Sequence, residues 1–86
     1  MNKFLAEINI MPHAQILDPQ GKAITGSMKN LGLAEIENIR MGKHITLEIH
    51  AENETSAREK VDKACRLLLV NLIMEEYTIT IHAQSH

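Results

Sequence analysis

The 86-residue chain has few aromatic residues, little cysteine, no long apolar run and no excess of positive charge. It holds no tryptophan, one phenylalanine and one tyrosine, so its core must consist of Ile, Leu, Val, Ala and Met. Sheets that bind RNA by stacking bases need aromatic side chains on their central strands. The formal net charge is −2, whereas nucleic-acid backbones demand clustered Lys and Arg. These absences argue against nucleic-acid binding.

The scarcity of cysteine and of long apolar runs bears on the compartment. The single Cys65 cannot form an internal disulfide, which small secreted domains usually need. The longest apolar run, Leu67 to Val70, has four residues, whereas a membrane span needs about 20. Glu7 and Asn9 interrupt the apolar start, which therefore lacks the core of a signal peptide. We expect a cytoplasmic protein that does not contact membranes.

A mass of 9.7 kDa corresponds to one small domain, which we place at residues 1–86. Surface scaling gives about 5,100 Å² for the folded chain against about 14,000 Å² for the unfolded one. The apolar content of 44% is ordinary for a globular domain. The chain can therefore build one modest core.

The pattern of apolar residues predicts three strands, two helices and a less regular fourth strand. Strict alternation predicts strands at 3–11 and 75–83, and at 45–49 in the second arm of a hairpin over 35–51. The first half of this hairpin alternates imperfectly, and residues 41–44 are its expected turn. A helix over 19–31 carries Ile24, Met28 and Leu31 on one face, and a second helix is expected between Asn53 and Asn71. Its apolar stripe is Ala57, Val61, Ala64, Cys65 and Leu68.

Local signals mark the bounds of the first helix. Asp18 can accept from free N–H groups of the first turn, and Pro19 fits the first helical position. Gly32 suits a left-handed C-terminal cap. Gly21 and Gly26 are poor helix formers, which suggests that another part of the backbone comes close to them.

The order β-α-β-β-α-β predicts a ferredoxin-like α+β sandwich, with a four-stranded antiparallel sheet and both helices on one face. The expected strand order is last, first, third, second. The covered face would carry Ile8, Ile45, Leu47, Ile49, Ile79 and Ile81. The opposite face mixes Leu5, Met11, threonines, histidines and carboxylates. It is either solvated or a partner surface, and the sequence leaves both open.

Residue types that commonly act in catalysis or bind metals do not form a recognisable cluster in the sequence. The histidines are scattered, His50 and His82 fall on strands that do not touch, and a zinc site needs about four converging ligands. Cys65 lies on an apolar helix face, as an inert thiol would. We therefore expect no catalytic residue, no cofactor and no metal. A small-molecule regulatory module of the ACT kind, which has no sharp motif, stays open.

Three stretches give the chain its resemblance to a known family. The first is Ile16-Leu17-Asp18-Pro19-Gln20-Gly21-Lys22-Ala23-Ile24, the second is Ile39-Arg40-Met41-Gly42-Lys43-His44-Ile45, and the third is Ala57-Arg58-Glu59-Lys60-Val61 with Cys65, Leu68, Leu69, Asn71 and Tyr77. In this order they resemble the PurS family, the small subunit of phosphoribosylformylglycinamidine synthase. Three positions depart from its pattern: Gln15 stands where the family often has Gly, Leu72 where it often has Pro, and Leu33 where it often has an aromatic residue.

The resemblance implies a subunit of a glutamine-dependent, ATP-using C–N ligase that is not catalytic by itself. It implies two partners, a glutaminase of the PurQ type and a synthetase of the PurL type, which the chain bridges while ammonia passes between them. A homodimer or a dimer of dimers is expected as well, since a half-apolar sheet face gains from being covered. The resemblance places interface or structural roles at Asp18, Pro19, Gly21, Arg40, Gly42 and Lys43. Arg40 could pair with a carboxylate across an interface.

Overall fold

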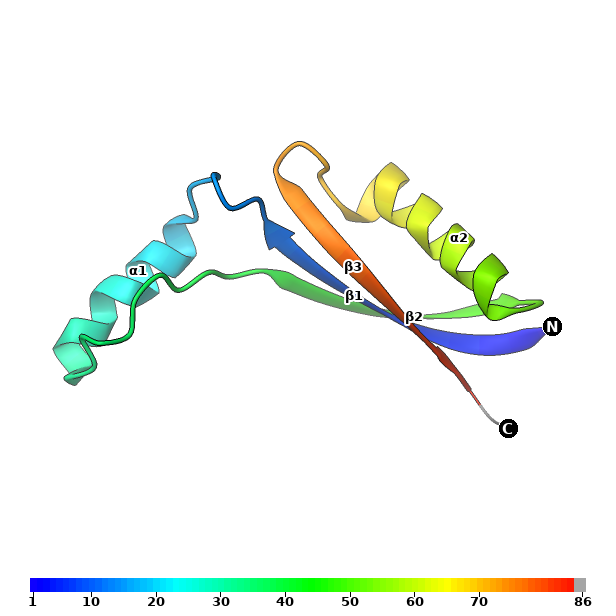
Figure 1. The fold of residues 1–86 in the computed structure, drawn as a ribbon, viewed down its shortest axis with the longest axis horizontal. Coiled ribbons are helices and arrows are strands. Elements are labelled where there is room, and N and C mark those ends of the chain that lie inside the picture. Colours follow the sequence, from blue (N-terminus) through cyan, green and yellow to red (C-terminus); the bar gives the residue numbers. More distant parts are fainter. Residues whose placement is uncertain (85–86) are drawn as a thin grey trace.

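The computed structural model describes residues 1–84, and its strands and helices follow one another along an elongated molecule (Figure 1). The elements are β1 (Asn2–Pro12), α1 (Pro19–Met28), the 3-10 turn η1 (Lys29–Leu31), β2 (Lys43–Ala51), α2 (Glu54–Ala64), the π-helical turn η2 (Cys65–Leu69) and β3 (Glu75–Ala83). Neither helix in this part of the chain is long and apolar enough to cross a bilayer.

The sheet places β1 in the centre, with β2 and β3 antiparallel on either side. Ile8 lies opposite Ile45 on β2 and Ile79 on β3, so these three side chains share one face. Leu5 lies opposite Glu48 and His82 on the other face. Because side chains alternate along a strand, this register gathers the apolar residues on one side, as the sequence predicted.

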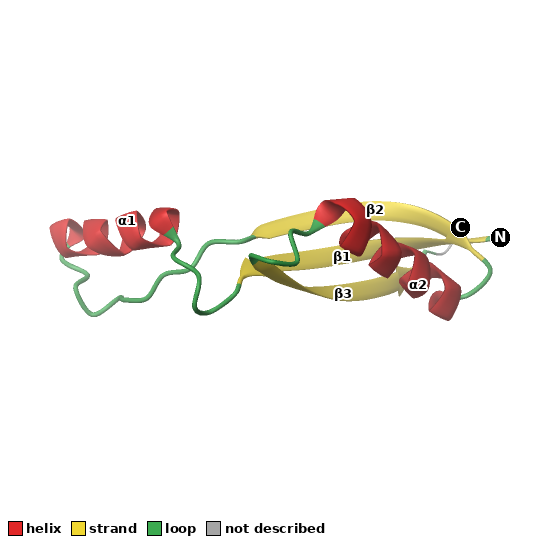
Figure 2. Cartoon of the chain, turned by 90° about the horizontal axis from the view of Figure 1, so that it is seen from above, coloured by secondary structure: helices red, strands yellow, loops and turns green. Residues whose placement is uncertain are grey.

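The core lies between that apolar face and α2, which crosses it diagonally (Figure 2). Ala57 and Val61 on α2 and Cys65 at the start of η2 are buried. From β1 come Phe4, Ala6, Ile8 and Ile10, which are 5% exposed or less. Full burial of a side chain the size of Ile stabilises a fold by about 1.5–3 kcal/mol. Asn53 begins α2 as predicted, since its side chain accepts from Ser56 N at 2.8 Å.

The predicted four-stranded sheet is wrong, because residues 1–84 contain a sheet of three strands. The missing strand is the first half of the expected hairpin over 35–51. The residues of that half run along α1 and form no regular strand pairing. Backbone groups that a strand would use are bound instead to a side chain of α1 and to the one that caps its N-terminus. Ile39 N donates to Thr25 Oγ1 at 3.1 Å, and Met41 N donates to the Asp18 carboxylate at 2.7 Å. The expected turn at 41–44 is therefore the entry into β2.

The prediction that both helices cover the sheet is also wrong, because only α2 does. The segment from His13 to Gly42, which contains α1 and η1, projects from one end of the sheet, and we call it the arm. Figures 1 and 2 both show α1 beyond the end of the strands. Gly32 ends η1 in the left-handed conformation with φ 76°, as predicted.

The apolar stripe of α2 changes direction at η2. Val70 N donates to Cys65 O at 2.9 Å, a bond that spans five residues instead of four. The extra residue rotates the following side chains by about 100°. Leu68, predicted to be in the core, is 83% exposed, and Leu69 packs against the core instead. Val70, not Asn71, is the C-terminal cap.

Candidate functional site

The residues selected from the sequence gather where the arm joins the sheet, in a region that we call the neck (residues 12–21 and 39–43). One shallow depression of about 220 Å³ is lined in part by Asp18, Pro19, Gly42 and Lys43. Gly21 and Arg40 adjoin it, since Gly21 N donates to Asp18 and the Arg40 guanidinium donates to Pro12 O. The chain therefore brings together two sequence motifs that are about 20 residues apart.

Asp18 joins the two segments of the chain that form the neck. One carboxylate oxygen accepts from Gly21 N at 3.0 Å, which caps α1, and the other accepts from Met41 N at 2.7 Å. These bonds from Gly21 and Met41 hold the pKa of Asp18 below its ordinary value of 3.8, and the nearby Arg40 charge lowers it further. The predicted helix cap is confirmed, and it has a second role that the sequence did not reveal.

Arg40 binds backbone carbonyls of the loop that follows β1. Its guanidinium donates to His13 O at 2.8 Å and to Ile16 O at 3.1 Å, with longer bonds of 3.4 Å to Pro12 O and Ala14 O. Five N–H donors in a fixed plane suit such a set of acceptors, which a lysine could not match. Arg40 thus fixes the direction in which the arm leaves the sheet.

Two glycines allow backbone segments to touch in the neck. A Cβ on Gly21 would overlap the carbonyl oxygen of Ile39, and one on Gly42 would overlap the carbonyl oxygen of Ile10. The close approach predicted at Gly21 is confirmed. The one predicted at Gly26 is wrong, because nothing lies within 4 Å of its Cβ position.

Lys43 begins β2 and remains largely in contact with solvent. Its side chain is 61% exposed, and the ammonium lies 3.0 Å from Glu75, whose side chain is 14% exposed. Asn71 N also donates to Glu75, at 2.9 Å. The bond from Asn71 and the one from Lys43 lower the pKa of Glu75. Lys43 therefore lies at the exposed edge of the neck, where the neck meets the sheet.

An open groove of about 810 Å³ runs between α1 and the loop at 14–18. Lys22, Lys29 and Arg40 line it together with polar and apolar side chains. Among residues 1–84, no buried side-chain nitrogen or oxygen lacks a hydrogen-bond partner. The groove therefore holds no buried polar group aimed at an absent ligand.

Groups that could perform catalysis are dispersed in the described part of the chain. Residues 1–84 include no cluster of three or more His, Cys, Asp or Glu that could hold a metal ion. Cys65 is buried, and burial raises the pKa of its thiol. Tyr77 donates to Asp62, which raises the pKa of Tyr77 to about 12 and ties β3 to α2.

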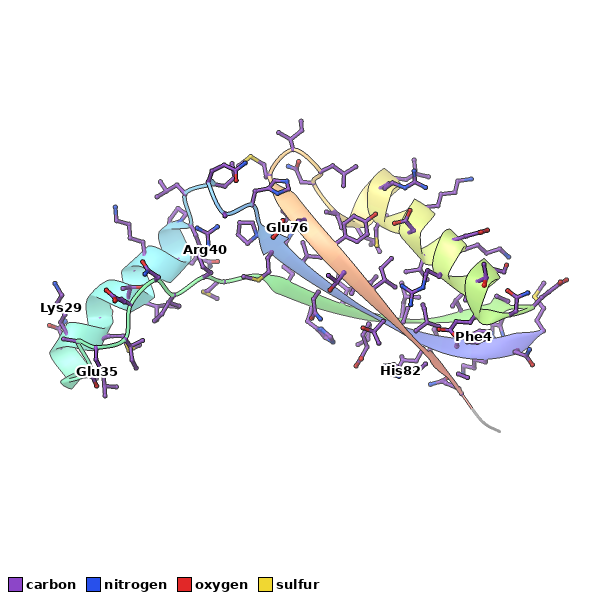
Figure 3. The ribbon with its side chains drawn as sticks, in the orientation of Figure 1. Phe4, Lys29, Glu35, Arg40, Glu76 and His82 are labelled. Carbon is purple, nitrogen blue, oxygen red and sulfur yellow. The ribbon has the colours of Figure 1, made fainter. Side chains whose placement is uncertain are left out.

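The uncovered face of the sheet consists largely of paired polar side chains. Glu7 binds His82 at 2.9 Å, Lys3 binds Glu48 at 2.8 Å, and His44 lies 2.7 Å from the Asn9 side-chain oxygen. Figure 3 shows His82 on β3, far from the arm. Each pair joins neighbouring strands, so this face is consistent with contact with solvent.

Sequence reasoning missed the amount of apolar surface outside the core. On the arm, exposed large side chains are Leu17, Leu31, Leu33, Ile36 and Met41. A second group follows α2, in a segment that we call the apolar turn: Leu67, Leu68, Leu72, Ile73 and Met74. The helical spacing of Ile24, Met28 and Leu31 revealed an apolar face, but not that the chain leaves it uncovered.

Comparison with known proteins places the chain among PurS proteins. The PurS family model, described as phosphoribosylformylglycinamidine (FGAM) synthase, matches residues 5–83. The PurS subunit of Thermotoga maritima is 37% identical over 79 residues, which cover 92% of this chain and 96% of the relative. The PurS subunit of Mycobacterium leprae is 38% identical with the same coverage. A chain in the structure of PurLQS from Thermotoga maritima superimposes with a TM-score of 0.87 at 35% identity, over 95% of this chain and 100% of that one.

Proposed function

Because the chain belongs to the PurS family of phosphoribosylformylglycinamidine synthase subunits, we propose that it is the non-catalytic small subunit of that synthase in purine biosynthesis. A PurQ-type glutaminase releases ammonia from glutamine. A PurL-type synthetase uses this ammonia and ATP to convert formylglycinamide ribonucleotide into the amidine. The chain bridges the two in the cytoplasm, so that ammonia passes without escaping.

The likeness to a chain of PurLQS over almost the full length carries this proposal. A protein that aligns from end to end with such a chain is suited to the same place in its own complex. The chain also associates with itself, as a homodimer or a dimer of dimers. Its contribution is to position subunits, which requires surfaces and a fixed shape rather than reactive groups.

Lys43 is the residue of the neck that we propose as a contact with partner subunits. Its side chain is 61% exposed, and its ion pair with Glu75 lies at the surface, where such a pair is worth about 1 kcal/mol or less. Arg40 holds four carbonyls of its own chain and orients the arm. Asp18, Pro19, Gly21 and Gly42 shape the backbone around both.

Reconstitution tests the subunit role. The chain is mixed with its synthetase and glutaminase, and amidine formation from glutamine is compared with formation from free ammonium. We expect turnover from glutamine to require the chain and turnover from ammonium to proceed without it. If both rates are indifferent to the chain, the proposal is rejected. A regulatory module of the ACT kind predicts instead that an amino acid or nucleotide raises the melting temperature of the isolated chain.

The same assay tests Lys43. Reversal of its charge in Lys43→Glu should weaken assembly about tenfold. The partner surface that attracts the native positive charge would repel the negative charge of the variant. Lys60→Glu, an equal change at an exposed position of α2, is the control and should assemble as the wild type does. Circular dichroism checks that both variants fold. Equal assembly by the two variants would remove Lys43 from the interface.

A further inference from the structure

Gly26 lies in the middle of α1, where its own chain gives no reason for a glycine. Gly21 and Gly42 each lie against another backbone segment, and Gly32 adopts a left-handed conformation. Among residues 1–84, by contrast, nothing lies within 4 Å of the Cβ position of Gly26. A glycine inside a helix destabilises that helix relative to alanine, and one of its uses is to let a ligand approach the backbone closely.

The open space above Gly26 belongs to the groove of about 810 Å³ between α1 and the loop at 14–18. Lys22, Gly26 and Lys29 follow one another at spacings of four and three residues, so they line the groove from one side of the helix. The apolar stripe of α1 lies on the other side of the helix and consists of Ile24, Met28 and Leu31. The groove is therefore separate from this stripe.

Three positive charges surround the groove. Lys22, Lys29 and Arg40 line it, and none of them forms an ion pair with an acidic side chain of residues 1–84. Figure 3 shows Lys29 at the far end of the arm and Arg40 where the arm meets the sheet. Asp18 also lines the groove, but its carboxylate oxygens already accept from two backbone N–H groups. The charge of the lining is therefore complementary to an anion.

The middle of the groove is suited to a flat apolar group. Lys22 and Lys29 are seven residues apart, which is about 10 Å along the axis of α1. Gly26 lies between them, and its lack of a side chain allows a flat group to lie against the helix. Ile39 forms the opposite wall, where its N–H donates to Thr25 Oγ1 at 3.1 Å. A neutral middle thus separates two positive ends.

The wall of the groove also contains a strained backbone position. Asn38 has φ 58°, and among residues 1–84 it is the one residue other than glycine with a positive φ. Asn38 lines the groove next to Ile39. Conformations of this kind cost free energy and are found preferentially at sites that hold ligands. The groove therefore combines a strained wall, an unexplained glycine and positive charges without acidic partners.

We propose that this groove binds a small organic anion that carries a negative group at each end of a flat apolar body. The body lies over Gly26 and against Ile39, and the negative groups meet Lys22 and Lys29. A volume of about 810 Å³ falls within the roughly 300–1,000 Å³ of small-molecule sites. Carboxylates and phosphates share the required charge, and the experiment distinguishes them. This inference goes beyond the proposed function and does not depend on it.

Isothermal titration calorimetry with three naphthalene compounds tests the chemistry of the ligand. The compounds carry on each ring a carboxylate, a phosphate or a neutral hydroxymethyl group. At least one of the two dianions should bind tenfold or more tightly than the neutral compound, and the preferred dianion identifies the negative group. Lys29→Gln should weaken this binding about tenfold, whereas Lys60→Gln on the exposed side of α2 is the control and should not. Equal affinities for all three compounds, or no binding of either dianion, would overturn the proposal.

Gly26→Leu tests where the dianion binds. The variant should fold, because leucine favours a helix more than glycine does and nothing lies within 4 Å of the Cβ position. The new side chain fills the groove and should weaken dianion binding at least tenfold. Ser27→Leu is the matched control, since Ser27 is the next exposed residue of α1 and does not line the groove. Circular dichroism checks that both variants fold.

Wild-type affinity in Gly26→Leu, or an equal loss of affinity in Gly26→Leu and Ser27→Leu, would place the dianion elsewhere and overturn the proposal. The reconstitution described above tests the subunit role without any of these compounds. Failure of either proposal therefore leaves the other standing.

Discussion

Two side chains, Asp18 and Arg40, determine the shape of the neck, and both do so by binding backbone groups. The Asp18 carboxylate accepts from two N–H groups, and the Arg40 guanidinium donates to four carbonyls. Hydrogen bonds to charged groups contribute more than those between neutral groups. The junction between arm and sheet is thus held by few residues, which makes each of them testable.

The pH dependence of stability should reveal the role of Asp18. A carboxyl group whose pKa is lowered by folding stabilises the fold above its ordinary value, here 3.8, and this contribution is lost as the pH falls through the lowered pKa. Asp18→Asn should therefore be less stable than the wild type at pH 6. The difference should shrink towards zero as the pH falls well below 3.8.

Chemical denaturation of both proteins between about pH 2 and pH 6 measures this difference. Glu75, whose pKa is also lowered, is present in both proteins, so its contribution cancels. A difference in the free energy of unfolding that stays constant over this range would contradict the assignment of the charge on Asp18 as the stabilising feature.

At the scale of elements, η2 decides which leucine of the run at 67–69 enters the core. A regular α-helix would place Leu68 on the stripe with Val61 and Cys65. The π-helical bond from Val70 to Cys65 rotates the chain, so that Leu69 packs against the core. Neighbouring leucines of identical chemistry therefore occupy opposite environments.

These two leucines form a matched pair for measurement. Leu69→Ala should lower the free energy of unfolding by about 1–3 kcal/mol, because it leaves a partial cavity beside the core. Leu68→Ala should change it by about 0.5 kcal/mol or less, as expected for an exposed position. Denaturation with urea decides the question, and the reverse ranking would mean that α2 continues as a regular helix.

Elements with short-range signals could be predicted from the sequence. The caps at Asp18, Gly32 and Asn53 were correct, and so were β1 and β3, whose side chains alternate strictly. The segment containing Ile36 and Ile39 was misread as a strand, because its backbone binds Thr25 and Asp18, which lie far away in sequence. The π-helical turn was also missed, since a run of leucines is compatible with either helix type.

The candidate site could be predicted as a set of residues but not as an arrangement. The motifs around Asp18 and Arg40 were selected from the sequence, and the structure brings them together at the neck. Nothing in the sequence indicates that Arg40 binds carbonyls of the loop after β1, since carbonyls belong to every residue. The uncovered stripe was likewise hidden, because the spacing of Ile24, Met28 and Leu31 does not reveal what covers them.

At the scale of the whole molecule, stability should depend on concentration, because the proposed function includes association of the chain with itself. Association that favours the folded state raises the melting temperature as the protein concentration rises. The wild type should therefore melt several degrees higher at about 100 times the concentration. Differential scanning fluorimetry over a dilution series measures this shift. A melting temperature independent of concentration would contradict the self-association.

The way in which Arg40 holds the loop after β1 has a consequence for how such a protein can diverge. Within residues 1–84, the hydrogen bonds of the guanidinium all go to the carbonyl oxygens of Pro12, His13, Ala14 and Ile16, and these atoms do not change when a side chain is replaced. Gln15 stands in the middle of this loop, and its carbonyl is not among these acceptors. Mutations there can accumulate without altering the direction of the arm. Substitutions of side chains in this loop can thus change its surface while the backbone that sets the direction of the arm stays constant.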